Sequence, residues 1–175
     1  IIVGALVFVG IVVFLDVIKQ LFINEQYWDA IVIVPIVLLA NLFLGIYHNL
    51  SVWYKLTDKT RYGMLFSIIG AVITVIINVA LIPVIGYIAS AWATLFAYGS
   101  MMVISYYLGK EKYPIPFEMK KILTYLFASI TLACISFYVQ ELRETFVFGI
   151  LAIIGFSYYI YKNEKEVILK IIKRK

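Results

Sequence analysis

The sequence predicts an all-α polytopic membrane protein, a helical bundle with six transmembrane helices, from its composition, its apolar runs and the placement of its basic residues. Of its 175 residues, 64% are hydrophobic and only 14% are charged, with a mean hydropathy of +1.00. A soluble domain of this size cannot bury so much apolar surface. Six apolar runs of roughly 17–25 residues match a hydrocarbon core of ~30 Å at about 1.5 Å rise per residue. The runs cover residues 1–22, 30–54, 63–82, 87–108, 122–140 and 145–161.

The basic residues predict how these helices are oriented. When the gaps between the runs are assigned alternately to the outside and the inside of a membrane, only Lys19 and Arg143 fall outside. The other thirteen of the fifteen basic residues fall inside. Because Lys and Arg resist translocation, this distribution predicts an inside tail. The net charge of +5 is therefore interpreted as a signal of topology, and nucleic acid is not among the expected partners.

Tyrosine and tryptophan mark the same boundaries, because their rings favour the headgroup region of a bilayer. Tyr27, Trp28, Tyr87 and Tyr138 fall at predicted outer ends. The aromatic residues at predicted inner ends are Trp53, Tyr54, Tyr62, Tyr106, Tyr107, Tyr113, Tyr158, Tyr159 and Tyr161. Two unrelated classes of residue thus predict one topology.

The first two predicted helices form a hairpin whose connection lies outside. Helix 1–22 rises to the outside and carries Asp16 and Lys19 on one face near its outer end. Helix 30–54 returns, and we expect it to bend at Pro35, which has no backbone N–H to donate. The chain begins inside an apolar run without Met, so we expect further protein upstream.

The third and fourth predicted helices are joined by a tight outer turn. We expect helix 63–82 to end at Pro83, with Gly86 completing the turn. The next helix, 87–108, has a face of small residues spaced four apart: Ala89, Ala93 and Ala97. Such a face predicts close packing between helices, or a surface that slides during a conformational change.

The last part of the chain is predicted to be a hairpin with a basic tail. Helices 117–140 and 145–161 form the hairpin, and the tail 162–175 mixes apolar residues with lysines. The tail is expected to lie as a helix on the inner membrane surface, to extend the last helix or to fray. We therefore divide the chain into four helices over 1–108 and the hairpin with its tail over 109–175.

The residues needed for covalent chemistry are scarce. The sequence has one His (His48), one Cys (Cys134), no pair of carboxylates within the apolar runs and no glycine-rich phosphate loop. Hydrolysis and group transfer need positioned acid, base or nucleophile groups. We therefore expect no catalytic residues, no metal ligands, no cofactor and no enzymatic activity, and we interpret Cys134 as a packing residue.

A small polar set lies within the predicted helices, where polar groups are costly and often functional. Asp16 is the only carboxylate near the apolar part of the first five predicted helices, and it is a candidate for ion coupling. Its alternative role is an ion pair with Lys19 at the membrane surface. The substrate-cavity candidates are Asn41, His48, Asn49, Thr74 and Asn78. Their alternative role is structural, as hydrogen-bonding groups between helices or at the interface.

Four segments carry a resemblance to a known family: residues 27–36, 44–62, 70–94 and 113–117. In these segments the chain resembles the C-terminal part of bacterial O-antigen and oligosaccharide flippases, which belong to the multidrug/oligosaccharidyl-lipid/polysaccharide exporter superfamily. The resemblance extends over about residues 10–125. The Asn-(x)4-Pro-(x)2-Gly pattern that ends at Gly86 is widespread in the superfamily, whereas His48 departs from the aromatic residue usual at its position.

This resemblance implies a fold of fourteen helices in two lobes, of which the first eight are missing from this chain. It also implies a flippase that moves an undecaprenyl-pyrophosphate-linked oligosaccharide to the outer leaflet of the bacterial inner (plasma) membrane, for O-antigen and lipopolysaccharide biosynthesis. The implied partners are this lipid-linked sugar, membrane lipids and the missing N-terminal lobe, and the implied C-terminus is cytoplasmic. The cationic group for the pyrophosphate would then lie in the missing lobe.

Three other functions remain open at this point. A multidrug cation antiporter of the same superfamily would need a buried acidic site. A membrane enzyme such as a polymerase or an acyltransferase would show large outer loops or His/Arg pairs, whereas the predicted outer loops are short. A non-transporting scaffold is weakly disfavoured by the polar residues of the second and third helices.

Overall fold

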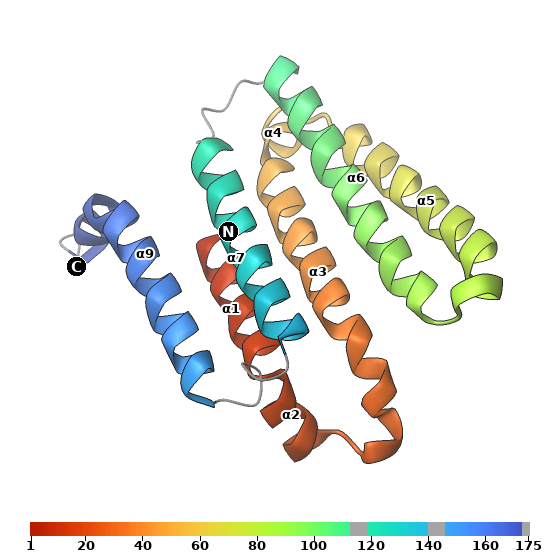
Figure 1. Cartoon of the computed structure of the whole chain (residues 1–175). Coiled ribbons are helices and arrows are strands. Elements are labelled where there is room, and N and C mark those ends of the chain that lie inside the picture. Colours follow the sequence, from red (N-terminus) through yellow and green to blue (C-terminus); the bar gives the residue numbers. More distant parts are fainter. Residues whose placement is uncertain (113–118, 140–145, 173–175) are drawn as a thin grey trace. The chain divides into compact units, whose positions relative to one another are not determined.

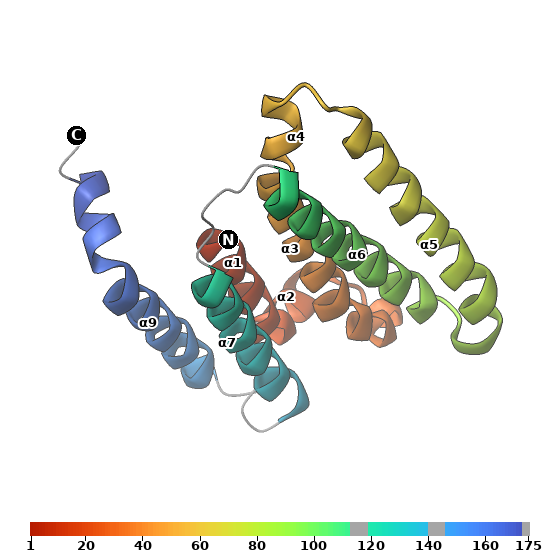
Figure 2. The ribbon, with the colours of Figure 1, turned by 90° about the horizontal axis from the view of Figure 1, so that it is seen from above.

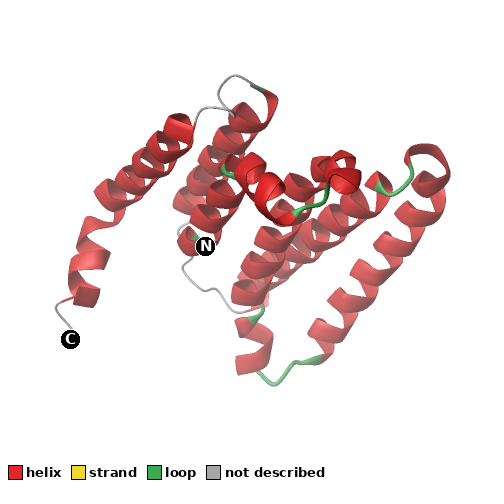
Figure 3. Ribbon diagram, turned by 90° about the horizontal axis from the view of Figure 1, so that it is seen from below, coloured by secondary structure: helices red, strands yellow, loops and turns green. Residues whose placement is uncertain are grey.

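The computed structural model of the chain describes residues 1–112, 119–139 and 146–172, and the side chains of all of these except 119, 146–148 and 166–172. Within these ranges every regular element is a helix and no strand occurs (Figures 1 and 3). The elements are α1 (Ile2–Val13), α2 (Leu15–Phe22), the 3-10 helix η1 (Glu25–Val32), α3 (Ile33–Leu50), α4 (Val52–Leu56), α5 (Arg61–Ile85), α6 (Ile88–Lys112), α7 (Met119–Tyr138) and α9 (Phe146–Ile172).

The predicted class, an all-α bundle with membrane-spanning helices, is confirmed in its coarse form. Among the described residues, four helical segments are long and apolar enough to cross a membrane. The number rises to five if the bent pair of α1 and α2 forms one span. Six spans stay a prediction. The segments 113–118, 140–145 and 173–175, which include parts of a predicted loop, an outer turn and the tail, lie outside the described residues.

The chain forms two compact units. Unit 1 consists of Asp29–Lys120 together with Ile1 and contains α3, α4, α5 and α6. Unit 2 consists of Ile2–Trp28 and Lys121–Lys175, so that it combines the first helix of the chain with the last two. Gly10 of α1 lies near Ile153 of α9, and Gly149 of α9 lies against Val13 and Phe14. The sequence did not suggest this pairing of the first helix with the last.

The first predicted helix, 1–22, is bent rather than straight. Its two halves, α1 and α2, meet at an angle of 65°. Phe14, between them, has φ −94° and ψ 17°, outside the helical range. The backbone bonds from Phe14 N to Gly10 O (3.2 Å) and from Ile18 N to Phe14 O (3.0 Å) continue across the break. The helix axis therefore changes direction at Phe14 without leaving these backbone groups unpaired.

The two prolines lie elsewhere in their helices than the sequence predicted: Pro35 lies in the first turn of an α-helix, and Pro83 does not end its helix. Pro35 is the third residue of α3, in the first turn, where a helix has no acceptor for its N–H groups. Pro83 lies inside α5, which continues to Ile85. So close to the end of a helix, proline removes a single backbone bond. The helix ends at Gly86 (φ 61°, ψ −142°), whose N–H donates to the carbonyl of Ile82 at 2.9 Å.

Helix α6 is the core of unit 1 and packs against both α3 and α5. Apart from Ala91, its buried positions recur every four residues along one face. They are Ala89, Ala93, Ala97, Met101, Ser105 and Gly109. Two facing contacts depend on glycine. A Cβ on Gly70 of α5 would lie 2.6 Å from Met101 Sδ, and one on Gly109 would lie 2.8 Å from Cδ1 of the Trp53 indole. The predicted small-residue face thus lies in a helix–helix contact.

Helix α9 continues through most of the predicted tail. It runs from Phe146 to Ile172, but Glu164 has non-helical dihedral angles (φ −113°, ψ 16°), and the axis changes direction there (Figure 2). The tail as far as Ile172 is therefore helical rather than frayed, and it is bent relative to the rest of α9.

The contact between Gly109 and Trp53 makes a testable prediction about stability. Replacing Gly109→Ala places a methyl group against a rigid buried ring, so we expect a loss of about 1–3 kcal/mol in the free energy of unfolding. Gly45→Ala is the matched control, because a Cβ there meets nothing within 4 Å and removes the glycine penalty of roughly 0.5–1 kcal/mol. Thermal unfolding in detergent measures both. A Gly109→Ala protein as stable as Gly45→Ala would contradict the packing described.

Candidate functional site

One face of α3 carries polar side chains that the chain leaves exposed. Asn41, His48 and Asn49 are all exposed, as is Gly45 between them. Gly45 follows Asn41 by four residues, His48 follows Gly45 by three, and Asn49 is next to His48. At helical spacing all four residues therefore lie on one side of the helix. The opposite side packs in unit 1 through Ala40, Leu42, Ile46, Tyr47 and Leu50, which are buried. An apolar span therefore has one buried apolar side and one exposed polar stripe.

The two amides of this stripe are partly engaged with their own helix. Asn41 Nδ2 donates to the carbonyl of Val37 at 2.8 Å, and Asn49 Nδ2 donates to the carbonyl of Gly45 at 2.9 Å. Each amide keeps an oxygen acceptor and a second N–H donor. The ring of His48 lies 5.6 Å from that of Tyr47 and adds an imidazole to the stripe. Such groups can donate to and accept from hydroxyls, but they supply no fixed charge.

Thr74 and Asn78 lie on a different face, on α5. With Phe66 and Gly70, which are buried against α6, they form a row of residues spaced four apart along α5. Thr74 Oγ1 donates to the carbonyl of Gly70 at 2.9 Å, as threonines in membrane helices often do. Asn78 Oδ1 is buried and has no hydrogen-bond partner. A buried amide oxygen without a donor is costly, so Asn78 is the less satisfied of the two.

The predicted cavity residues therefore fall into two groups. Asn41, His48 and Asn49 share the exposed face of α3, whereas Thr74 and Asn78 share the face of α5 that contacts α6. Because α6 packs against both α3 and α5, the packing of α6 keeps the two groups apart. The α3 group is exposed, whereas Thr74 and Asn78 are half-buried, and we call Asn41, His48 and Asn49 the α3 polar face.

Asp16 lies in the first turn of α2, immediately after the bend at Phe14, and it is half-buried. A carboxylate is favoured at that end of a helix. Lys19, its predicted partner, has its Nζ 4.1 Å from the centre of the Trp28 ring, in a cation–π contact. Within the described ranges, no three His, Cys, Asp or Glu side chains are close enough together to hold a metal ion.

An aromatic cluster at the junction of α3, α4, α5 and α6 was not predicted. Trp53 and Tyr54, which the sequence places at the inner end of a predicted helix, are buried within the protein, with 1% and 6% of their surfaces exposed. The hydroxyls of Tyr47 and Tyr54 lie 3.1 Å apart in a hydrogen bond. The sequence signal was present, because the segment 47–66 is rich in aromatic residues. The cluster's buried members are Tyr47, Trp53, Tyr54, Phe66 and Met101.

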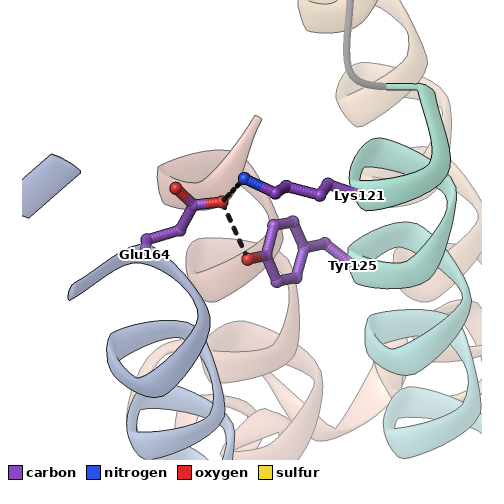
Figure 4. Close-up of polar contacts among 3 residues, drawn as sticks. All are labelled: Lys121, Tyr125 and Glu164. Atoms are coloured by element: carbon purple, nitrogen blue, oxygen red, sulfur yellow. Dashed lines mark hydrogen bonds and ion pairs between the residues drawn. The ribbon is translucent and has the colours of Figure 1, made fainter. Parts of the chain in front are cut away.

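A second unpredicted polar group joins α7 to α9 within unit 2. Glu164 Oε1 accepts a hydrogen bond from the Tyr125 hydroxyl at 3.1 Å and lies 3.4 Å from Lys121 Nζ (Figure 4). Only 11% of the Glu164 side chain is exposed. The same side of α7 also buries Ser129 and Ser136. The available signal was the spacing of Phe156, Ile160 and Glu164, which places a carboxylate on an apolar face.

The comparisons with known proteins identify no relative. No protein-family model, no curated protein and no solved structure matches the chain.

The hydroxyl pair of Tyr47 and Tyr54 generates a second prediction. Tyr54→Phe leaves the buried Tyr47 hydroxyl without its partner, so we expect a loss of about 1–3 kcal/mol in the free energy of unfolding. In the double variant Tyr47→Phe/Tyr54→Phe both polar groups are gone, so stability should largely return. A double-mutant cycle by chemical unfolding measures the coupling. Additive losses would contradict a hydrogen bond between the two.

Proposed function

We propose that this chain is the C-terminal part of an O-antigen or oligosaccharide flippase, which moves lipid-linked oligosaccharide from the cytoplasmic to the outer leaflet of the bacterial inner membrane. The proposal includes six spans, the sixth within α9, a fourteen-helix two-lobe fold and a cytoplasmic C-terminus. The remaining lobe is supplied by protein upstream. The substrate is undecaprenyl-pyrophosphate-linked oligosaccharide. The resemblance to this family noted from the sequence, in residues 27–36, 44–62 and 70–94, supports the choice.

The α3 polar face is the observation that carries the proposal. In hydrocarbon, an amide or imidazole without hydrogen-bond partners costs several kcal/mol, roughly 2–7 for an amide-like group. A membrane helix therefore keeps such groups on an exposed side only where water, another segment or a ligand meets them. Asn41, His48 and Asn49 would then line a wet passage. Their donors and acceptors can replace the water that sugar hydroxyls lose on entering the membrane.

The carboxylates of the described helices favour a sugar over a cationic drug. The buried carboxylate of Glu164 on α9 is already paired with Lys121, so it is not free to bind a cation. The sequences of α3 (Ile33–Leu50) and α5 (Arg61–Ile85) contain no Asp or Glu, so neither helix offers an anionic site for a cation. They also contain no Lys, and the one Arg, Arg61, stands at the end of α5. The pyrophosphate of the substrate would therefore be bound by cationic groups of the upstream lobe. This division assigns sugar contacts to α3 and phosphate contacts to the rest of the protein.

The role of the α3 polar face is tested by a single substitution in the full-length protein. Asn41→Leu keeps a side chain of similar size but removes the amide, so we expect flipping to fall about tenfold, the equivalent of roughly 1.4 kcal/mol. The measurement is transport of a fluorescent lipid-linked oligosaccharide in proteoliposomes.

Thr94→Val is the matched control for this test. Thr94 is also a polar residue on a helix long enough to span a membrane. It is half-buried, and its Oγ1 donates to the carbonyl of Ser90 on its own helix at 2.8 Å, as Asn41 Nδ2 donates to the carbonyl of Val37. Because Thr94 lies on α6, outside the α3 polar face, we expect transport to stay near the wild-type rate. Equal losses in the two variants would show a general packing effect and would contradict the proposed site.

Complementation tests the wider proposal. The full-length gene should restore surface polysaccharide in a bacterial host that lacks its own flippase, since both lobes are needed for alternating access. A gene for residues 1–175 alone should not restore it, although membrane insertion of the product must be verified. Restoration by residues 1–175 alone would refute a half-transporter.

A further inference from the structure

One end of unit 1 gathers exposed basic side chains, where α4, the first turn of α5 and the last turn of α6 meet (Figure 1). Gly109 of α6 lies against the Trp53 indole of α4. Lys112 Nζ of α6 lies 5.1 Å from the centre of the Tyr62 ring of α5. These two contacts bring the three helix ends together. The five exposed basic residues there, which we call the basic end, are Lys55, Lys59, Arg61, Lys110 and Lys112.

The connection between α4 and α5 holds part of the basic end on a fixed backbone. The N–H of Lys59 donates to the carbonyl of Tyr54 at 2.8 Å. The N–H of Asp58 donates to the carbonyl of Lys55 at 3.4 Å, and these two bonds together form a Schellman motif. Asp58 takes the left-handed position of the motif, with φ 54°. Because Tyr54 is buried in the aromatic cluster, the turn is anchored to the core, and its backbone needs no ordering when a ligand binds.

The positive charges of the basic end outnumber the carboxylates around it. Two carboxylates, Asp58 and Glu111, stand beside the five basic residues in the sequence. Among the residues that the structure describes, no carboxylate forms an ion pair with a member of the basic end. Lys112 lies over the Tyr62 ring in a cation–π contact, which leaves its exposed ammonium group charged. The basic end therefore has positive charge available to an anionic ligand.

Exposed apolar side chains border the basic end. Leu56, next to Lys55, is 66% exposed. Met64, three residues after Arg61, is 59% exposed, and α5 is long and apolar enough to cross a membrane. In a bilayer such side chains meet acyl chains, while nearby Lys and Arg side chains reach the level of the phosphates. Nucleic acid and acidic proteins have no acyl chains to cover this border, so the combination of charge and apolar surface favours anionic lipid.

We propose that the basic end is a binding site for the headgroups of anionic phospholipids. The lipid phosphates lie against the lysines and Arg61, and the acyl chains of the same molecules run along Leu56 and Met64. A zwitterionic lipid fits less well, because its headgroup carries a positive charge that the lysines repel. Unit 1 therefore concentrates anionic lipid around α4 and the first turns of α5. This inference needs α5 in a membrane, but it does not depend on transport of any substrate.

Lipid-selective quenching in the full chain tests this site. In a Cys134→Ser background, a bimane fluorophore is attached at Leu56→Cys, on the apolar border. The vesicles contain equal parts of phosphatidylglycerol and phosphatidylcholine, and one of the two lipids is brominated at the same acyl position in each experiment. We expect brominated phosphatidylglycerol to quench about twice as strongly as brominated phosphatidylcholine. In 1 M salt, where the Debye length is about 3 Å, this quenching ratio should approach one.

Val84→Cys is the matched reporter. Val84 is 76% exposed and lies at the other end of α5, so the two brominated lipids should quench a fluorophore there equally. Equal quenching by the two lipids at Leu56→Cys would overturn the proposal. The same preference at both reporters would also overturn it, because the anionic lipid would then gather around the whole protein.

A soluble phosphate separates a lipid site from a site for free anions. Glycerol 3-phosphate carries the phosphate group without acyl chains. At the ionic strength of a sodium chloride control, an excess of it should leave the quenching ratio at Leu56→Cys as it is in that control. A ratio that falls to one only in glycerol 3-phosphate would overturn the assignment to lipid and show a site for soluble phosphate.

Two pairs of substitutions test which residues supply the preference. Lys55→Gln/Lys59→Gln and Lys110→Gln/Lys112→Gln each remove two charges from the basic end. Each pair should bring the quenching ratio at Leu56→Cys closer to one, although the second pair lies on a different helix from the reporter. If one pair does not fold, the other decides. An unchanged ratio in the pairs that fold would overturn the proposal.

Lys162→Gln/Lys165→Gln is the matched charge control. Both lysines are exposed on α9, outside the basic end, and their replacement removes the same amount of charge. The quenching ratio at Leu56→Cys should therefore stay unchanged in this pair. A fall as large as that in the basic-end pairs would overturn the proposal, because the preference would then follow net charge alone.

Discussion

Unit 1 depends on the close approach of two helices to α6. Within a bilayer, apolar side chains gain nothing from leaving lipid for protein, so helices associate through close packing and polar contacts. Three large side chains meet glycines at these contacts: Met101 at Gly70, Trp53 at Gly109 and Phe43 at Gly99. The same contacts determine which side of α3 is free. With Phe43 and Tyr47 committed to unit 1, the α3 polar face must turn away from α6.

The two units differ in how the polar groups on their helices are paired. In unit 2, Glu164 is almost fully buried and is satisfied by Tyr125 and Lys121 from another helix. In unit 1, Asn41 and Asn49 satisfy one N–H each within α3 and leave the rest of each amide to the exposed side. A buried and satisfied group specifies a structure, whereas an exposed and partly satisfied group is available for binding. This difference is why a binding role is assigned to α3 and a structural role to Glu164.

The sequence predicted the helices better than the contacts between them. Long apolar runs locate α3, α5, α6 and α7 because span length is set by the thickness of a bilayer. The positions of Pro35 and Pro83 relative to the helix ends were predicted wrongly, since the ends of a helix are the part that a sequence locates least well.

The contacts were harder to predict because they bring together residues far apart in the chain. Tyr125 and Glu164 are 39 residues apart, and no local pattern pairs them. An aromatic residue near the end of a span can face headgroups or another helix, and spacing alone does not decide between these. Trp53 faces Gly109, so it is buried. The separation of Asn41 from Asn78 is likewise a property of how α6 packs, which residue types alone do not encode.

Gly86 has a consequence for the order in which unit 1 assembles. Its φ and ψ of 61° and −142° lie in a region that side chains with a Cβ rarely enter, and only Gly86 and Tyr87 separate α5 from α6. So short a connection costs little loop-closure entropy, and each pairing it brings about is local in the chain. We therefore expect α5 and α6 to pair first, starting at their turn, during biosynthesis. Helix α3 then packs against α6 in a later step.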